Sequence, residues 1–165
     1  MNYSSLRLQL LRMMHKDQMA IKTPAKFRIV TENNSEKLKD IIFKYGWPTI
    51  TIVGKQACEA AWLIAQHADH DVVFQKKCLQ LICFSLKKGD VPRYHYAYLY
   101  DRICANTGSP YQRFGTQIRI DKSKIYEPYP PTRLHTKKLD VLRRRYDLPP
   151  LEEYLFELKS LNSKK

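Results

Sequence analysis

The segment that decides the fold lies at residues 46–71 and reads GWPTITIVGKQACEAAWLIAQHADHD. Gly46 suits a helix C-cap, where a left-handed residue is needed, and Pro48 prevents that helix from continuing. From Gly54 the pattern predicts a new helix that is apolar nearly all round, which indicates a buried central position. This helix ends in the polar residues of 66–71, whose side chains must be satisfied or must line a cavity.

Apolar residues recur at helical spacing on both sides of this segment, and only 5 of the 165 residues are glycine. These features favour helices over a turn-rich sandwich. Helices are predicted over residues 4–20, from a cap at Asn34 or Ser35 to Tyr45, from Gly54 to Gln66, from Asp71 to Gly89, from Pro92 to Gly108, over 137–146 and from Pro149 to 158. We therefore expect a mainly α protein, a bundle of six to seven helices with a long irregular loop and at most a short β segment.

The connections between these helices carry further expectations. Pro24 interrupts the helical pattern, so a connector is predicted over residues 22–32. The β-branched run at 49–53 predicts a short strand or an extended lead-in to the next helix. The segment 109–133 holds four prolines and is predicted to form an irregular loop with a short strand at 117–120. A loop of that length in a compact domain is more often functional than idle.

The length of 165 residues suits one domain with its own core. We expect that domain to span 1–165, with a core at about 4–158 and a solvated tail at 159–165. Four cysteines without C-x-x-C spacing fall on apolar helix faces, which favours buried free thiols in a reducing compartment. The chain begins with no apolar h-region and contains no run of membrane-spanning length. Cytoplasmic location without a membrane partner is the default, and export by a specialised secretion system stays open.

The chain is strongly basic, with a formal net charge of +13. Residues 87–145 carry 14 Lys and Arg against 5 Asp and Glu. Such an excess attracts anions, so we expect an anionic small molecule as partner, with an acidic protein or nucleic acid as alternatives. No basic run exceeds three residues, and an ordinary lysine-rich composition that serves solubility explains the same charge.

His67 is the residue best suited to acid–base chemistry, because a free imidazole titrates near neutrality, and Asp69 or Asp101 is expected to orient it. A buried histidine with satisfied nitrogens is the alternative. His67, His70, Asp71 and Asp101 are also the candidate metal ligands, and the adjacent pair His70-Asp71 with a distant aspartate resembles the helical HD phosphohydrolases. Against a metal, Asp71 is placed to cap the next helix. The sequence names no cofactor.

Arg102 offers a planar guanidinium for two-point recognition of carboxylate or phosphate, with a structural ion pair between helices as the alternative. Gln112, Thr116 and Gln117 flank Gly115 and offer amide and hydroxyl groups to a polar ligand. The same loop has backbone groups of its own to satisfy, and these side chains are equally suited to that task.

Several motifs occur in a distinctive order along the chain. They are Asp17-Gln18, Gly46-Trp47-Pro48, Val53-Gly54, Ala60-Ala61 with Gln66-His67-Ala68-Asp69, Phe74-Gln75, Ala97-Tyr98-Leu99 with Asp101-Arg102, Gly108, Gln112, Phe114-Gly115-Thr116-Gln117, and Arg143-Arg144 with Leu148-Pro149. Together they resemble a bacterial family of unknown function, number 6624 in its series, over roughly residues 15 to 155. Each motif alone is weak and the combination is specific. That family usually has tyrosine before the glycine of the loop motif, and this chain has Phe114 there.

The resemblance implies a polar pocket rather than a particular activity, because its signature residues are polar and spread over several helices and a loop. The site residues carried over from it are Asp17, Gln18, His67, Asp69, Asp101, Arg102, Gln112, Gln117 and Arg144. By residue type we expect His67, Asp69 and Asp101 to be catalytic, and the others, with Gln66, to bind substrate. From charge and residue types, the leading hypothesis is hydrolysis or group transfer on a phosphorylated or nucleotide-like small molecule, with the glutamine-rich loop closing over it. The alternatives are a non-enzymatic adaptor that binds through its basic C-terminal half, and a metal-dependent HD-like phosphohydrolase.

Overall fold

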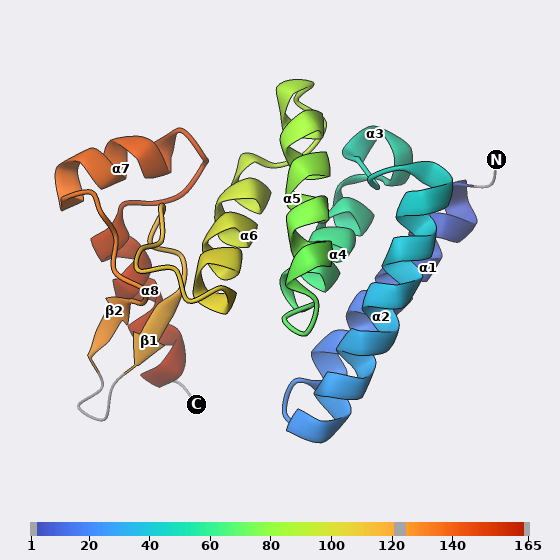
Figure 1. Ribbon diagram of the computed structural model, residues 1–165, viewed down its shortest axis with the longest axis horizontal. Coiled ribbons are helices and arrows are strands. Elements are labelled where there is room, and N and C mark those ends of the chain that lie inside the picture. Colours follow the sequence, from blue (N-terminus) through green and yellow to red (C-terminus); the bar gives the residue numbers. More distant parts are fainter. Residues whose placement is uncertain (1–2, 121–124, 164–165) are drawn as a thin grey trace. The chain divides into compact units, whose positions relative to one another are not determined.

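The computed structural model describes residues 3–120 and 125–163 and is mainly α (Figure 1). Within these residues it has eight helices and one two-stranded sheet, which confirms the predicted fold class with one helix more than expected. The chain divides into two compact units, unit 1 (Met1–Val91) and unit 2 (Pro92–Lys165). The single domain expected from the sequence stays a prediction. None of the helices in the described residues combines the length and the apolarity needed to cross a membrane.

Unit 1 is built around its fourth helix. Its helices are α1 Tyr3–Ala20, α2 Pro24–Tyr45, α3 Ile50–Val53, α4 Lys55–Gln66 and α5 Val72–Lys87. Helix α4 contacts the other four, and its alanines and Cys58 are fully buried. Small side chains let neighbouring helices approach closely, and Figure 1 shows α1 and α2 lying side by side next to α4. The sequence-based prediction of a buried central helix is confirmed.

The predicted connector over residues 22–32 is wrong, because α2 already begins at Pro24. Proline is tolerated at the first helical position, where its fixed φ suits the helix and no intrahelical donor is lost. Asn34 and Ser35, expected to cap a helix, are instead buried in the middle of α2. The Asn34 amide donates a hydrogen bond of 3.1 Å to the Met13 carbonyl, so it joins α2 to α1.

The β-branched run at 49–53 forms the short helix α3 rather than a strand. No neighbouring strand is present in the described part of unit 1 to pair with it. Its backbone is held by Asp90, whose carbonyl accepts from the Ile50 amide at 3.0 Å and whose carboxylate accepts from the Thr51 amide at 2.8 Å. Tertiary hydrogen bonds thus override the local β preference of valine, isoleucine and threonine.

Unit 2 consists of α6 Arg93–Asn106, the hairpin strands β1 Ile118–Ile120 and β2 Tyr126–Pro128, α7 Thr136–Arg144 and α8 Leu151–Ser163. The strands pair antiparallel, with Ile118 opposite Pro128. A strand at β1 was predicted, whereas its partner β2 was not. Helix α8 continues through residues 159–163, which the sequence assigned to a tail, and residues 164–165 lie outside the described residues.

The core of unit 2 is aromatic. Ala97 of α6, Phe114 of the loop and Leu148 after α7 are buried together. Tyrosines surround them: Tyr94, Tyr96, Tyr98, Tyr100 and Tyr146. Phe114 lies edge-on to Tyr146, with ring centroids 4.7 Å apart. The loop therefore inserts its phenylalanine into the core of unit 2.

Candidate functional site

In unit 1 the structure joins three predicted site residues into one cluster. Asp17 is fully buried on α1, and His67 follows the last residue of α4. The Nδ1 atom of His67 lies 2.7 Å from Oδ1 of Asp17, and the Gln18 amide donates to the same oxygen at 3.2 Å. Phe27 of α2 packs edge-on against the imidazole, with ring centroids 5.3 Å apart. Asp17, rather than Asp69 or Asp101, is therefore the carboxylate that orients His67.

This pairing gives the two imidazole nitrogens different roles. Because Nδ1 donates to a carboxylate, Nε2 is the nitrogen left to accept or deliver a proton. The His67 side chain is 17% exposed, so it remains in reach of solvent. The second oxygen of Asp17, Oδ2, is buried and has no hydrogen-bond partner in the described part of the chain.

The neighbouring polar residues hold the turn between α4 and α5. The Gln75 amide donates to the carbonyls of Ala65 and Gln66, at 3.2 and 3.3 Å, and to Asp69 Oδ1 at 3.4 Å. Gln66 is itself buried. Asp69 thus contacts Gln75 of α5. The catalytic role predicted for Asp69 and the substrate-binding role predicted for Gln66 stay predictions.

His70 and Asp71 connect the same turn to α2. Nε2 of His70 lies 2.9 Å from the Ser35 hydroxyl. Asp71 accepts from the Phe74 amide at 2.9 Å, which confirms the predicted cap of α5, and its other oxygen lies 2.8 Å from the Lys39 ammonium. The hydrogen bond from Lys39, and then that from the Phe74 amide, lowers the pKa of Asp71. Nowhere in residues 3–120 and 125–163 do three or more His, Cys, Asp or Glu side chains form a group that could hold a metal.

Asp101, in unit 2, organises a loop. It is fully buried on α6 and accepts from the backbone amides of three loop residues: Arg113 at 2.8 Å, Phe114 at 3.1 Å and Thr116 at 3.0 Å. The Thr116 hydroxyl adds a fourth donor at 3.0 Å. Burial raises the pKa of Asp101, and the hydrogen bonds from the loop oppose that rise. The carboxylate is thus saturated by the loop that it shapes.

The two glutamines predicted to bind a ligand also bond within this loop. The Gln112 amide nitrogen donates to the carbonyls of Gln117 and Pro130, at 2.8 and 2.6 Å, and its oxygen accepts from the Gln117 backbone amide at 2.9 Å. The Gln117 side chain accepts from Arg102 at 3.1 Å. The Gln112 side chain therefore satisfies the loop backbone, whereas the Gln117 side chain bonds to the side chains of Arg102 and Thr116. A ligand-binding role for Gln112, Gln117 and Arg102 stays a prediction.

Sequence reasoning missed Arg143, which is the largest fully buried side chain in the described residues. It donates to the carbonyls of Phe114 at 2.6 Å, Gly115 at 3.1 Å and Pro149 at 2.7 Å. The sequence analysis predicted that its exposed neighbour Arg144 binds the substrate. One feature of the sequence indicated the burial of Arg143. It follows the buried Leu139 by four residues and therefore lies on the same face of the helix.

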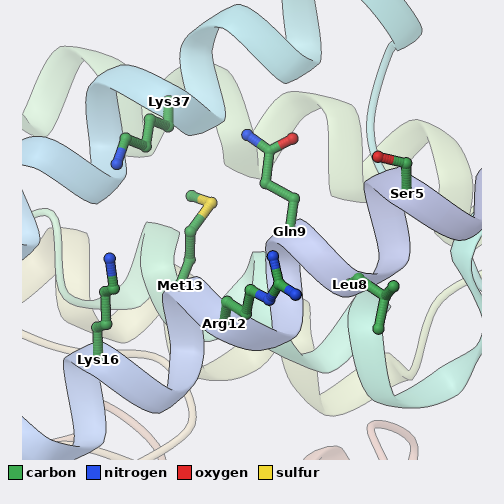
Figure 2. A pocket seen from close by; sticks show the side chains of 7 residues that line it. All are labelled: Ser5, Leu8, Gln9, Arg12, Met13, Lys16 and Lys37. Carbon is green, nitrogen blue, oxygen red and sulfur yellow. The ribbon is translucent and has the colours of Figure 1, made fainter.

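Two hollows have linings suited to anions. In unit 1 a groove of about 270 Å³ lies between α1 and α2 (Figure 2); it is lined by Ser5, Leu8, Gln9, Arg12, Met13, Lys16 and Lys37. In unit 2 a larger pocket of about 510 Å³ is lined by Tyr100, Cys104, Ser109, Pro110, Tyr111, Gln112, Arg113, Arg133, Leu134 and Leu142. None of the described residues in either lining is Asp or Glu. Both hollows therefore have a positive lining.

Comparison with known proteins yields a family without an assigned activity. A family model described as a family of unknown function, DUF6624, matches residues 6–164. No curated protein and no solved structure matches the chain.

Proposed function

The chain belongs to this family of unknown function, DUF6624, and we propose that it is an acid–base enzyme in which His67 carries the proton. One observation supports this proposal above all: Nδ1 of His67 is held 2.7 Å from a fully buried carboxylate of Asp17. A buried aspartate behind a partly exposed histidine sets the tautomer and holds the imidazole in one orientation. Asp17 acts as a positioning residue, and His67 is the proposed catalytic group.

The proposed reaction is hydrolysis or group transfer on a phosphorylated or nucleotide-like small molecule. Nε2 of His67 would take a proton from water or from an acceptor hydroxyl as its oxygen bonds to phosphorus. The resulting imidazolium would then return the proton to the leaving oxygen, whose bond to phosphorus breaks. Asp17 holds the imidazole in place throughout the reaction.

The charge of unit 1 supports an anionic substrate. Arg12 and Lys16 on α1, and Lys37 on α2, surround the groove of Figure 2, where Lys37 extends toward the α1 side chains. None of these three cations forms an ion pair or a side-chain hydrogen bond with another described residue. Residues 1–91 carry 14 Lys and Arg against 8 Asp and Glu, so unit 1 has a net charge of +6, and this positive potential attracts phosphorylated molecules.

The test is turnover by the purified full chain on nucleoside phosphates and aryl phosphate esters, followed as released phosphate. We expect His67→Gln to lower kcat by about 10²- to 10⁴-fold, the usual contribution of a general acid–base group. Asp17→Asn should also lower kcat and should change the pH dependence of kcat/KM, because the amide no longer fixes the tautomer of the imidazole. Both variants must keep the far-ultraviolet circular dichroism of the parent. Full activity in a folded His67→Gln variant would refute the proposal.

A further inference from the structure

The pocket of unit 2 has walls from four segments. Tyr100 and Cys104 come from α6, residues 109–113 from the following loop, residues 133–134 from the segment before α7, and Leu142 from α7. Its volume of about 510 Å³ falls in the range typical of small-molecule sites, about 300–1,000 Å³. The lining combines aromatic and aliphatic surface with two guanidinium groups, from Arg113 and Arg133.

Both guanidinium groups are placed over tyrosine rings. The Cζ atom of Arg113 lies 5.9 Å from the ring centroid of Tyr100, and that of Arg133 lies 4.8 Å from the centroid of Tyr111. Neither arginine forms an ion pair with any residue that the structure describes. Contact with an aromatic face restricts each side chain without neutralising its charge. The pocket therefore presents two oriented cations, whose planar geometry suits phosphate or carboxylate oxygens.

Two buried polar residues that were predicted to be site residues, Gln112 and Asp101, hold the walls of this pocket in place. Gln112 joins the two loop segments, since its backbone amide donates to Pro131 at 3.0 Å and its side chain to Pro130 at 2.6 Å. Asp101 fixes the next residue through the Arg113 amide at 2.8 Å. All of these bonds join groups of the protein itself, and they fix the loop residues that line the pocket.

We propose that this pocket binds a small anionic ligand with a flat ring, of the size of a nucleoside monophosphate. The ring lies against Tyr100 or Tyr111 and the apolar side chains Leu134 and Leu142, and its phosphate meets Arg113 and Arg133. This site goes beyond the acid–base proposal for His67 and stands without it, because it concerns binding in unit 2 alone.

Calorimetric titration of the full chain with three probes tests the proposal: adenosine 5′-monophosphate, adenosine, and inorganic phosphate. The monophosphate should bind at least about tenfold more tightly than either fragment, because only it engages both the rings and the cations. The double variant Arg113→Ala/Arg133→Ala should weaken monophosphate binding by at least about tenfold. The control Lys137→Ala/Arg145→Ala removes the same charge outside the pocket and should leave binding within about twofold.

Thiol labelling locates the ligand independently. Cys104 lines the pocket and Cys83 lies on α5 of unit 1, and both are partly buried free thiols. Saturating monophosphate should slow alkylation of Cys104 by iodoacetamide severalfold and leave Cys83 unchanged, as followed by mass spectrometry of the peptides. Equal protection of both cysteines would overturn the proposed site. Binding of phosphate or adenosine as tight as that of the monophosphate, or equal loss in both double variants, would overturn the proposed ligand.

Discussion

The buried carboxylate of Asp101 permits a sharp test of what shapes the loop. We consider Asp101→Asn, which keeps the shape of the side chain and replaces one accepting oxygen with a donating NH₂ group. Oδ1 accepts from the Arg113 and Phe114 amides, and Oδ2 accepts from the Phe114 and Thr116 amides. Whichever way the asparagine turns, its NH₂ group faces a backbone N–H that was previously bonded.

The expected cost follows from these contacts. One N–H left without a partner costs about 1–3 kcal/mol, and each remaining bond loses about 1 kcal/mol when its acceptor is no longer charged. Burial raises the pKa of Asp101, so a neutral amide also removes part of a desolvation cost. We therefore expect the variant to lower the free energy of unfolding of this loop by about 2–4 kcal/mol.

Hydrogen exchange measured by mass spectrometry is the assay of choice, because it reports the loop directly. A loss of about 2–4 kcal/mol should speed exchange in peptides that cover residues 113–116 by roughly 30- to 900-fold. Trp47 and Trp62 both lie in unit 1, so their fluorescence checks that this unit is still folded. The matched control is Asp140→Asn. Its carboxylate accepts from one backbone amide, that of Leu151 at 2.9 Å, and an asparagine oxygen can replace it.

The proposed role of Asp101 would be refuted if loop exchange in Asp101→Asn stayed within about threefold of the parent, or if the Asp140→Asn control changed loop exchange as much. Either result would mean that core packing of Phe114, rather than the carboxylate, determines the loop conformation.

Three further perturbations are predicted from other contacts. Arg143→Lys should cost about 3 kcal/mol in urea unfolding because lysine cannot reproduce three bonds in a planar fork, whereas Arg144→Lys should cost almost nothing. Gly115→Ala should lower Tm more than Gly108→Ala. Both glycines have a positive φ, at 70° and 66°, so both substitutions strain the backbone. Only at Gly115 would the new Cβ atom also crowd a neighbour, because it would lie 3.3 Å from Cγ2 of Thr132. The lowered pKa of Asp71 means that its ionised form stabilises the folded state above its ordinary pKa of 3.8, and that this stability is lost as pH falls through the lowered value. Asp71→Asn should therefore be less stable than the parent at pH 7, by no more than about 1 kcal/mol for so exposed a pair, and the difference should disappear in acid.

The local pattern of the sequence was enough to predict a mainly α protein, the buried helix α4 and the Asp71 cap of α5. Helix spacing, capping and end signals act over three or four residues, so one stretch of chain contains all of the information. The same locality explains the errors. Pro24 is compatible with a helix start as well as with a helix break, and the residues that decide between them lie elsewhere in the fold.

Only the tertiary structure decided which polar groups meet. Asp17 and His67 are 50 residues apart, and they meet because α1 packs along α4. Likewise, Arg143 reaches the carbonyl of Phe114, 29 residues earlier, only because α7 folds over the loop. A sequence can show that a histidine or an arginine must be satisfied, because burying an unpaired polar group is costly. It cannot show which distant group satisfies it, because that partner is chosen by the packing of whole helices.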